Sequence, residues 1–347
     1  MKELAKSLIK KSRSYIYHKE QNATALKILK VQETQNGRLS KKERKLCIEY
    51  ALDIFGHKKY APWLMTYCSY QNQFKEGWIP DNYYGETVVP TIKGEYGRLC
   101  YRPLIVNKLI NHNQDSNLGY FINGYFLDIN DKIYQPIPFI EYIFQKHQKI
   151  VFKTEDSFQG RGIYIFNKNT FDLELIRKLG NGVFQGFIIQ HEFFNAFNES
   201  AVATIRVTSV CNNKGEIEIR GGFFKFGRST DSHVKTSTAI KIPYDFKTGR
   251  LYHKAFLPNW SSIDSLPDKN VDFSNMQLPN YDYCISEIKK LHKRVFYIGC
   301  IGWDITIDNN NNLRIIELNG FHNGIRFHEM TQGPCFTGLG WENLHKT

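Results

Sequence analysis

The most constraining feature of this sequence is a hairpin pattern near its end, in residues 301–319. Two apolar runs flank the polar run 309–312, which is typical of two strands joined by a turn. Glu317 and Asn319 lie two residues apart, so in a strand they point to the same face. The hairpin also brings Asp304 beside them. The pattern therefore predicts two carboxylates and an amide oxygen converging at one end of a sheet.

Oxygen ligands of this kind indicate a site for Mg²⁺ rather than a zinc site, and Mg²⁺ commonly binds nucleotide phosphates. Glu317 lies in an otherwise apolar strand, where an unpaired carboxylate costs free energy. That placement favours a site over a plain surface hairpin, which is the alternative from this stretch alone. We therefore predict that Asp304, Glu317 and Asn319 bind Mg²⁺, one ion or two, or Mn²⁺ in its place.

A second motif lies upstream, in residues 150–166. It indicates a strand ending near Lys153, a loop containing Gly160 and Gly162, and a second strand. It lacks the GxxxxGK[ST] signature of a Walker loop and does not open a helix as a dinucleotide-binding fingerprint does. Glycines in such a loop let backbone N–H groups approach phosphate oxygens closely. The motif predicts a phosphate-binding hairpin, and an ordinary hairpin with a polar loop is the alternative.

Polar side chains also interrupt two further apolar stretches. Residues 187–194 indicate a strand broken by three polar residues, and 202–210 a strand with Arg206 among β-branched neighbours. A half-buried arginine usually has an anionic partner, which here is either a structural carboxylate or a phosphate. Lys225 and Arg228 lie near the end of the next predicted strand.

Composition sets the class of protein. The chain has 347 residues, of which 41% are hydrophobic and 14% aromatic, so a large folded core is expected. No run approaches the 18 apolar residues of a membrane span, and the N-terminus lacks the continuous apolar segment of a signal peptide. Seven cysteines without CxxC spacing argue against a disulfide framework or a zinc site. They favour a reducing compartment, so we expect a cytoplasmic protein.

The formal net charge of +12 is unevenly distributed. Residues 1–60 contain 15 Lys and Arg against 6 Asp and Glu, and their periodicity predicts helices. One helix is expected over 41–55, started by a capping box of Ser40 and Glu43 and stopped by Gly56. A basic face of this kind attracts polyanions such as nucleic acid, anionic lipid or an acidic polysaccharide. A merely solvated helical face is the alternative.

Taken in order, these features resemble the ATP-grasp superfamily. The resemblance depends on the Lys153 strand with its glycine loop, the 187–194 segment, and Asp304 followed by Glu317 and Asn319. The stretches GWD, IIELN, ATIRVTS and KFG, with an upstream NK pair, narrow it to the sugar-transfer-associated branch. It implies an α+β fold in which two α+β subdomains grip ATP, with a mainly helical N-terminal extension.

Four regions are expected on this basis. They are a basic, mainly helical region 1–77, a small α/β subdomain 78–150, a nucleotide-lid subdomain 151–194 and a C-terminal subdomain 195–347 with the metal site.

The resemblance also implies roles for individual residues. Lys153 and the lysine of the NK pair, Lys108, would contact ATP. The phosphate lid would consist of Ser157, Gln159, Gly160, Arg161 and Gly162. The adenine linker would consist of Gln190, His191, Glu192 and Phe193. The transferred phosphoryl group or the acceptor would be faced by Arg206, Lys225 and Arg228. Gly302 and Trp303 stand where some related ligases have an arginine, whose role Arg206 or Arg228 would take.

The activity implied by the resemblance is that of an ATP-dependent carboxylate–amine ligase. A substrate carboxylate attacks the γ-phosphate to form an acyl phosphate, and an amine then displaces phosphate, leaving an amide and ADP. The residues suit this chemistry, because phosphoryl transfer needs positioning and charge neutralisation more than a protein nucleophile. No Ser–His–Asp or Cys–His constellation is visible in the sequence.

Association with the sugar-transfer branch suggests the joining of an amino acid to a uronic acid in capsular or cell-surface polysaccharide biosynthesis. The basic N-terminal region would then meet an anionic membrane surface, at its inner face, or a glycosyltransferase partner; nucleic acid is not expected. Two alternatives stay open. One is a kinase of the same fold that phosphorylates a sugar or another hydroxyl acceptor, and the other is a non-catalytic basic protein that binds polyanions.

Overall fold

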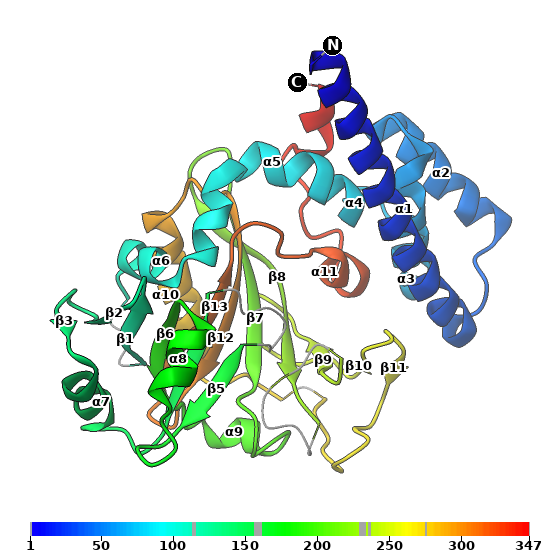
Figure 1. Ribbon diagram of the computed structural model, residues 1–347. Helices are drawn as coiled ribbons and strands as arrows, with labels where there is room; N and C mark the ends of the chain where they lie inside the picture. The colour runs from blue at the N-terminus through cyan, green and yellow to red at the C-terminus, as the bar shows by residue number, and fades with distance from the viewer. Residues whose placement is uncertain are drawn as a thin grey trace.

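Two antiparallel sheets and a cluster of N-terminal helices make up the protein (Figure 1). The computed structural model describes residues 2–112, 116–155, 162–228, 234, 237–274 and 276–346. The N-terminal helices gather at one end of the larger sheet (Figure 1). The smaller sheet lies on the opposite flank of the larger sheet (Figure 1). This mixture of helices and antiparallel sheets confirms the predicted α+β class.

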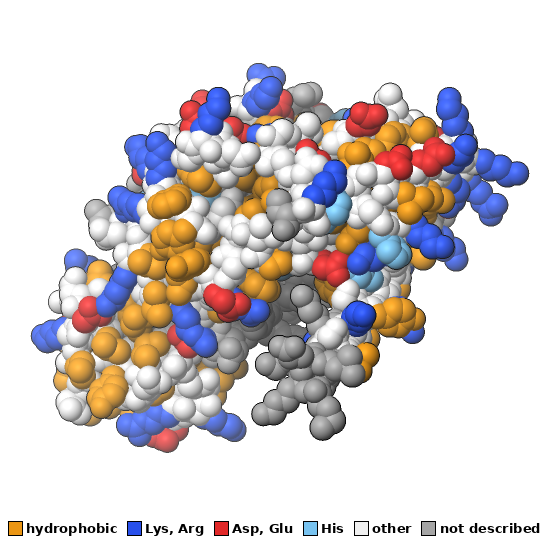
Figure 2. All heavy atoms as spheres, turned by 90° about the horizontal axis from the view of Figure 1, so that it is seen from above, with side chains coloured by type: hydrophobic (Ala, Val, Ile, Leu, Met, Phe, Trp, Pro, Cys, Tyr) orange, Lys and Arg blue, Asp and Glu red, His pale blue; other side chains and the backbone are white. Residues whose placement is uncertain are grey.

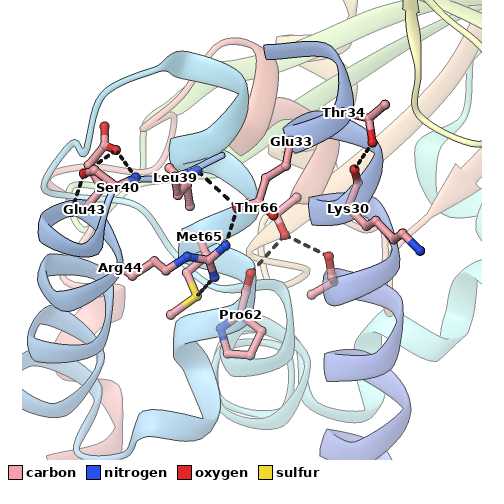
Figure 3. Close-up of polar contacts among 11 residues, drawn as sticks. Lys30, Glu33, Thr34, Leu39, Ser40, Glu43, Arg44, Pro62, Met65 and Thr66 are labelled. Carbon is pink, nitrogen blue, oxygen red and sulfur yellow. Dashed lines mark hydrogen bonds and ion pairs between the residues drawn. The ribbon is translucent and has the colours of Figure 1, made fainter. Parts of the chain in front are cut away.

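The N-terminal region consists of helices packed against one another. They are α1 (Lys2–Asn36), α2 (Lys41–Phe55), the 3₁₀ turn η1 (Lys58–Tyr60) and α3 (Ala61–Gln71). The predicted start of α2 is confirmed, because the Ser40 hydroxyl accepts from the Glu43 N–H and the Glu43 carboxylate accepts from the Ser40 N–H. Gly56 ends the helix at φ 75°, a conformation that favours glycine. Figure 3 shows this cap beside the ion pair of Arg44 with Glu33, which ties α2 to α1.

Helix α1 is one continuous helix of 35 residues, and Leu8 and Ile9 near its start are 60% and 53% exposed. Its C-terminal half is held by tertiary contacts that local periodicity does not reveal. The Thr66 hydroxyl on α3, for example, donates to the Ala25 carbonyl on α1 over 3.0 Å (Figure 3). Packing of this kind supplies most of the stability of helices in proteins.

Short helices connect this region to the smaller sheet. They are α4 (Asp81–Tyr83), the π-helical turn η2 (Tyr84–Val88), α5 (Val89–Ile92), the 3₁₀ segment η3 (Gly94–Tyr101) and α6 (Pro103–Ile110).

The smaller sheet has the strand order β3-β2-β1-β6-β4-β5. Its strands are β1 (Asn117–Ile122), β2 (Tyr125–Asp128), β3 (Ile133–Tyr134), β4 (Ile150–Thr154), β5 (Ile163–Phe166) and β6 (Gly182–Gly186). Helices α7 (Pro136–Phe144) and α8 (Leu173–Leu179) pack on its core. Because β1 pairs with β6, the sheet draws strands from both sides of the boundary expected at residue 150. The described strands between residues 117 and 186 therefore belong to one sheet.

The larger sheet has the strand order β11-β10-β9-β8-β7-β12-β13. Its strands are β7 (Thr204–Cys211), β8 (Ile217–Phe226), β9 (Ile240–Pro243), β10 (Ala255–Phe256), β11 (Ser262–Ile263), β12 (Cys300–Ile307) and β13 (Leu313–Asn319). Helix α10 (Tyr281–Arg294) buries Ile288 and Leu291 in the core of this sheet. The strand predicted over 187–194 is wrong, because this segment leaves β6 as an extended linker and then forms α9 (Glu192–Asn195).

The N-terminal helices share one hydrophobic core with the larger sheet. Trp63 and Leu64 of α3 belong to the same buried cluster as Phe223 of β8 and Phe327 of α11 (Arg326–Thr331). The C-terminal 3₁₀ segment η4 (Trp341–Lys346) adds Trp341 to this cluster. The N-terminal helical region, which the sequence predicts as an extension, is therefore packed onto the end of the larger sheet.

Apolar and basic side chains gather on different parts of the surface. Figure 2 shows apolar side chains over the side of the smaller sheet and basic side chains along the opposite margin, where α2 lies. All seven cysteines are free thiols. Within the ranges described above, no helix has both the length and the apolar character needed to cross a membrane.

A chain of buried polar groups anchors β12 to α10. The Trp303 indole donates to the Ser209 hydroxyl over 2.7 Å, and that hydroxyl lies 2.7 Å from Nδ1 of His292. The other ring nitrogen of His292 lies 3.0 Å from the Ile298 carbonyl oxygen. Burial lowers the pKa of His292 from 6.5 to about 4, so the folded protein keeps this ring neutral.

The neutral ring predicts a dependence of stability on pH. Between about pH 6.5 and 4 the unfolded chain binds more protons at this position than the folded chain. The stability it contributes is therefore fully present above pH 6.5 and is lost as the pH falls toward 4. We expect the urea concentration at the unfolding midpoint to decrease over this window, and His292→Gln to flatten the decrease. His253→Gln, at an exposed position, is the matched control; equal slopes in His292→Gln and the wild type would contradict this assignment.

Candidate active site

A cleft lies between the two sheets, where β4, β5 and the end of β6 face β7, β8, β12 and β13. Both apolar and charged side chains line it. The apolar side chains include Val151, Ile163, Ile165, Phe187, Ile188, Val202 and Ile316. The charged side chains are Lys153, Lys225, Asp304 and Glu317. The sequence motifs that lie 150 residues apart thus meet in one cleft.

The predicted acidic pair forms as expected from the hairpin. Asp304 and Glu317 are direct partners across β12 and β13, and Asn319 is paired with Gly302 on the same face. Burial and the nearby Asp304 carboxylate raise the pKa of Glu317 above its ordinary value. The Asn319 side chain lies near enough to Asp304 to help lower the pKa of that carboxyl through a hydrogen bond. The three side chains named as metal ligands therefore lie together.

Arg206 holds the other carboxylate of the pair. Its Nε donates to Oδ1 of Asp304 over 2.6 Å and its Nη2 to Oδ2 over 2.9 Å, while Nη1 donates to the Asn323 carbonyl over 3.0 Å. Although burial opposes it, the guanidinium keeps the pKa of Asp304 below its ordinary value. A Cβ atom at position 302 would lie 3.0 Å from Nη1 of Arg206, so Gly302 leaves the space that this side chain needs. Arg206, one of the two residues predicted to take the role of an arginine at position 302 or 303, thus lies on the strand next to β12.

Two lysines flank the acidic pair. Nζ of Lys153 reaches across from β4 and donates to the Ile316 carbonyl on β13 over 3.3 Å. Burial lowers the pKa of Lys153 to about 8, although the Glu317 and Asp304 carboxylates raise it. On the other side, Nζ of Lys225 lies 3.9 Å from Oδ2 of Asp304. Cations from both sheets therefore border the carboxylates.

These residues fit the oxygen-ligand metal that the sequence predicts. Two carboxylates directly opposite each other repel, and the raised pKa of Glu317 reflects that cost. A divalent cation offsets the repulsion, and hard oxygen donors are the ligands that Mg²⁺ takes. Within the described ranges no group of three or more His, Cys, Asp or Glu side chains forms a metal cluster, so substrate oxygens and water would complete such a site.

Residues 173–343 match the sequence model of a known family, described as sugar-transfer associated ATP-grasp. This is the family that the sequence resembles. The match includes Arg206, Lys225, Asp304, Glu317 and Asn319, but it begins in α8 and so leaves Lys153 outside. Among curated proteins, none matches the chain.

Solved structures with a similar arrangement include ligases and synthetases. The ATP-grasp ligase PsnB, complexed with a minimal precursor, aligns with a TM-score of 0.40 and 12% identity over 69% of this chain and 58% of its own. An N5-carboxyaminoimidazole ribonucleotide synthetase from Thermotoga maritima aligns with a TM-score of 0.37 and 11% identity over 66% and 44%. The Staphylococcus aureus synthetase complexed with ADP gives 0.37 and 14% over 62% and 43%. The chain thus spans about half the length of these proteins.

The segment that lines the cleft after β6 lies a few residues before the predicted adenine linker. The cleft is lined by Gly186, Phe187 and Ile188, not by residues 190–193. The predicted residues have structural partners. The Gln190 amide donates to the Asn198 carbonyl over 2.6 Å and accepts from the Ala203 N–H, and Nδ1 of His191 caps α9 by accepting from the Phe193 N–H. The Phe193 ring packs on Phe194 and Phe224, and Glu192 opens α9.

The sequence contains a feature that marks the segment after β6, which borders the cleft. Phe187 and Ile189 are large apolar residues directly after a buried strand, and in the structure they are 38% and 64% exposed. Exposed apolar side chains at the rim of a cleft are typical of a ligand-binding edge.

Two predicted site residues lie away from the cleft lining. Lys108 on α6 forms an ion pair with Asp131, so the structure does not bring it to the nucleotide cleft. Arg228 forms two 2.5 Å contacts with Asp268, through Nε and Nη2. Both positions therefore have carboxylate partners of their own.

Most of the predicted lid lies outside the described residues, namely Ser157, Gln159, Gly160 and Arg161. Gly162 is described and has φ 75°, a left-handed conformation that favours glycine. Its carbonyl accepts from the Thr154 N–H over 3.0 Å, which closes the hairpin beside Lys153. The hairpin itself is thus confirmed, with β4 and β5 paired in register.

The two lysines predicted to contact ATP can now be separated by experiment. Lys153→Met removes a cation from the cleft and should raise the Kd for Mg-ADP about tenfold or more, since charge-assisted contacts contribute about 1.5–3 kcal/mol. Lys108→Met is the matched control, because it removes a lysine whose partner lies outside the cleft. Isothermal titration calorimetry of both variants measures the effect, and equal losses of affinity would contradict the placement of the site.

Proposed function

We propose that this protein is an ATP-dependent carboxylate–amine ligase that forms an amide through an acyl phosphate. The acceptor acid is a uronic acid, and the amine an amino acid, in the synthesis of a cell-surface polysaccharide. The observation that supports the proposal best is the division of charge across one sheet face. Glu317 and Asp304 lie at one side of the cleft, and Arg206 and Lys225 continue from them on the next strands.

This division suits the two substrates of such a ligase. The acidic side, with Mg²⁺ bound, would neutralise and orient the nucleotide phosphates. Lys153 would add a cation from the opposite sheet, where it lies beside Glu317. Lys225 would attract the carboxylate of the acceptor to the γ-phosphate, and Arg206 holds Asp304 ionised and in place. Catalysis of this type depends on positioning and charge neutralisation.

The reaction then needs no covalent enzyme intermediate. A carboxylate oxygen of the acceptor forms a bond to the γ-phosphorus while the bond to the bridging oxygen of ADP breaks. The amine nitrogen attacks the carbonyl carbon of the acyl phosphate, phosphate leaves, and the amine loses a proton. Among the described residues of the cleft, the hydroxyls are those of Ser200 and Thr204, and neither is hydrogen-bonded to a histidine or carboxylate. The cleft thus lacks an activated nucleophile in its described part.

We also propose that the protein works in the cytoplasm near the inner face of the membrane. The support is the basic helix α2, on which Lys41, Lys42 and Lys45 are exposed. Basic groups near anionic lipid contribute about 1 kcal/mol each. Sedimentation with vesicles of mixed phosphatidylcholine and phosphatidylglycerol should show binding that 0.5 M salt removes; no binding to anionic vesicles at low salt would refute this location.

The activity is tested by release of ADP and phosphate from Mg-ATP, with uronic acids crossed against amino acids. Release that requires both partners, with an amide product lighter than its two substrates by one water, is the expected result. Glu317→Gln should lower kcat on the order of 10²-fold or more, because it removes a charged metal ligand. Glu174→Gln, at an exposed position on α8, is the matched control.

The same experiment separates the alternatives. A product that keeps the phosphate on a hydroxyl would identify a kinase. ATP binding without release under any combination would favour a binding role, and full activity in Glu317→Gln would refute the metal assignment.

A further inference from the structure

The face of the larger sheet that carries Asp304 continues past the cleft into a second cluster of cations. Lys241 on β9 lies directly opposite Lys225 on β8. Like charges directly opposite each other in a sheet are destabilising. Arg206 and Arg326 also lie near enough to disfavour the charged form of Lys241. Four cations thus converge beside the acceptor side of the cleft.

The carboxylates of this region are already engaged. Both oxygens of Asp304 accept from Arg206, and Oδ2 of Asp81 lies 3.6 Å from Nη1 of Arg326. No carboxylate in the described ranges lies within ion-pair distance of Lys241. Its Nζ is instead 5.2 Å from the centroids of Phe223 and Phe327. Cation–π contacts of this kind offset only part of the cost of removing an ammonium group from water.

An indole ring completes the wall of this cluster. The Trp260 centroid lies 5.5 Å from Nζ of Lys241 and 5.9 Å from the Arg326 guanidinium. Trp260 has φ 75°, a conformation that costs free energy for a residue with a large side chain. Its ring also packs on Phe327 of α11. The strained backbone holds an aromatic surface beside two cations.

The N-terminal helix fixes this strained turn. The fully buried Gln32 of α1 donates from Nε2 to the Trp260 carbonyl over 2.6 Å. Three residues later, Gln35 donates to the Ser262 carbonyl over 2.9 Å and accepts from the Ser262 N–H. Helix α1 therefore pairs with the backbone on both sides of residue 261.

We propose that Lys225, Lys241, Arg326 and the Trp260 ring form the acceptor site, and that this site binds a sugar through a carboxylate. The inference rests on the proposed ligase function and extends it to specific residues. Lys225, which lines the nucleotide cleft, and Lys241 would share the carboxylate at the γ-phosphate side. Arg326 and the indole would hold the sugar ring, since aromatic faces pack against the apolar faces of sugars. In this arrangement Gln32 is a positioning residue that acts through Trp260.

The test is calorimetric titration of the full chain, saturated with Mg-ADP, with glucuronate and galacturonate. Glucose serves as the neutral sugar, and glucose 6-phosphate and inorganic phosphate as the phosphate-bearing ligands. A uronate that binds while glucose does not is the expected result. Binding of phosphate compounds alone would overturn the proposal in favour of a phosphate site, and no binding of any uronate to the wild type would overturn it as well.

Lys241→Met keeps the length of the side chain and removes its charge. We expect it to weaken uronate binding about tenfold or more while the Kd for Mg-ADP stays within about twofold. Lys132→Met is the matched control, because Lys132 also stacks on a ring, at 4.8 Å from the Tyr134 centroid, but lies on the smaller sheet. Unchanged uronate binding in Lys241→Met would overturn the proposal.

Two further variants guard against a general loss of structure. Trp260→Leu should weaken uronate binding more than it weakens binding of acetate, which carries the carboxylate without the ring. Gln32→Met should weaken uronate binding and leave Mg-ADP binding unchanged; an equal loss of both would mean that Gln32 is only structural. Since ADP binding is measured separately, failure of the nucleotide site and failure of the acceptor site give different results.

Discussion

The site depends on one buried ion pair, that of Arg206 with Asp304 across β7 and β12. Both ions lose most of their hydration, and their two short hydrogen bonds offset that cost. Removing the arginine would leave an uncompensated carboxylate opposite Glu317, so each strand position around the pair is constrained. Gly302 leaves room for the guanidinium, and the Asn323 carbonyl accepts its remaining nitrogen. The arginine holds Asp304 ionised, whereas no arginine or lysine lowers the pKa of Glu317 below its ordinary value, so the proposed cation would compensate the charge of Glu317.

Strand register converts this pair into an ordered row. Side chains two residues apart lie on the same face of a strand, and each cross-strand pair extends the row onto the neighbouring strand. Glu317 faces Asp304, which faces Arg206, and one step along the same face Lys225 faces Lys241. The charge therefore changes sign across the sheet, from a side that suits a metal and phosphates to a side that suits an anionic acceptor. A slip of one residue in any pairing would turn the affected side chains into the opposite core.

Local pattern was sufficient for the features whose partners lie close in the chain. The Asp304–Glu317 hairpin, the capping box of α2 and the apolar stripe of α10 depend on spacing that can be counted in the sequence. Long-range pairing explains what could not be predicted. The pairing of β1 with β6 joins two expected subdomains, and the opposition of Lys225 and Lys241 spans a loop. Residues 190–193 are not among the described residues that line the cleft, and Gln190 instead satisfies the Asn198 carbonyl and the Ala203 N–H; a residue type cannot reveal such a commitment.

The same reasoning explains why the N-terminal helices are not a detachable appendage. A free helical arm needs few contacts with its neighbour, but α1 and α3 share a continuous core with α11 and β8. The turn at Trp260 is strained, and strain persists only where surrounding contacts over-determine the backbone. Here Gln32 and Gln35 supply those contacts, and the aromatic cluster around Phe327 supplies the packing. Acceptor recognition and the stability of the helical region are thus parts of one structure, because the wall that would select the acceptor is built from both.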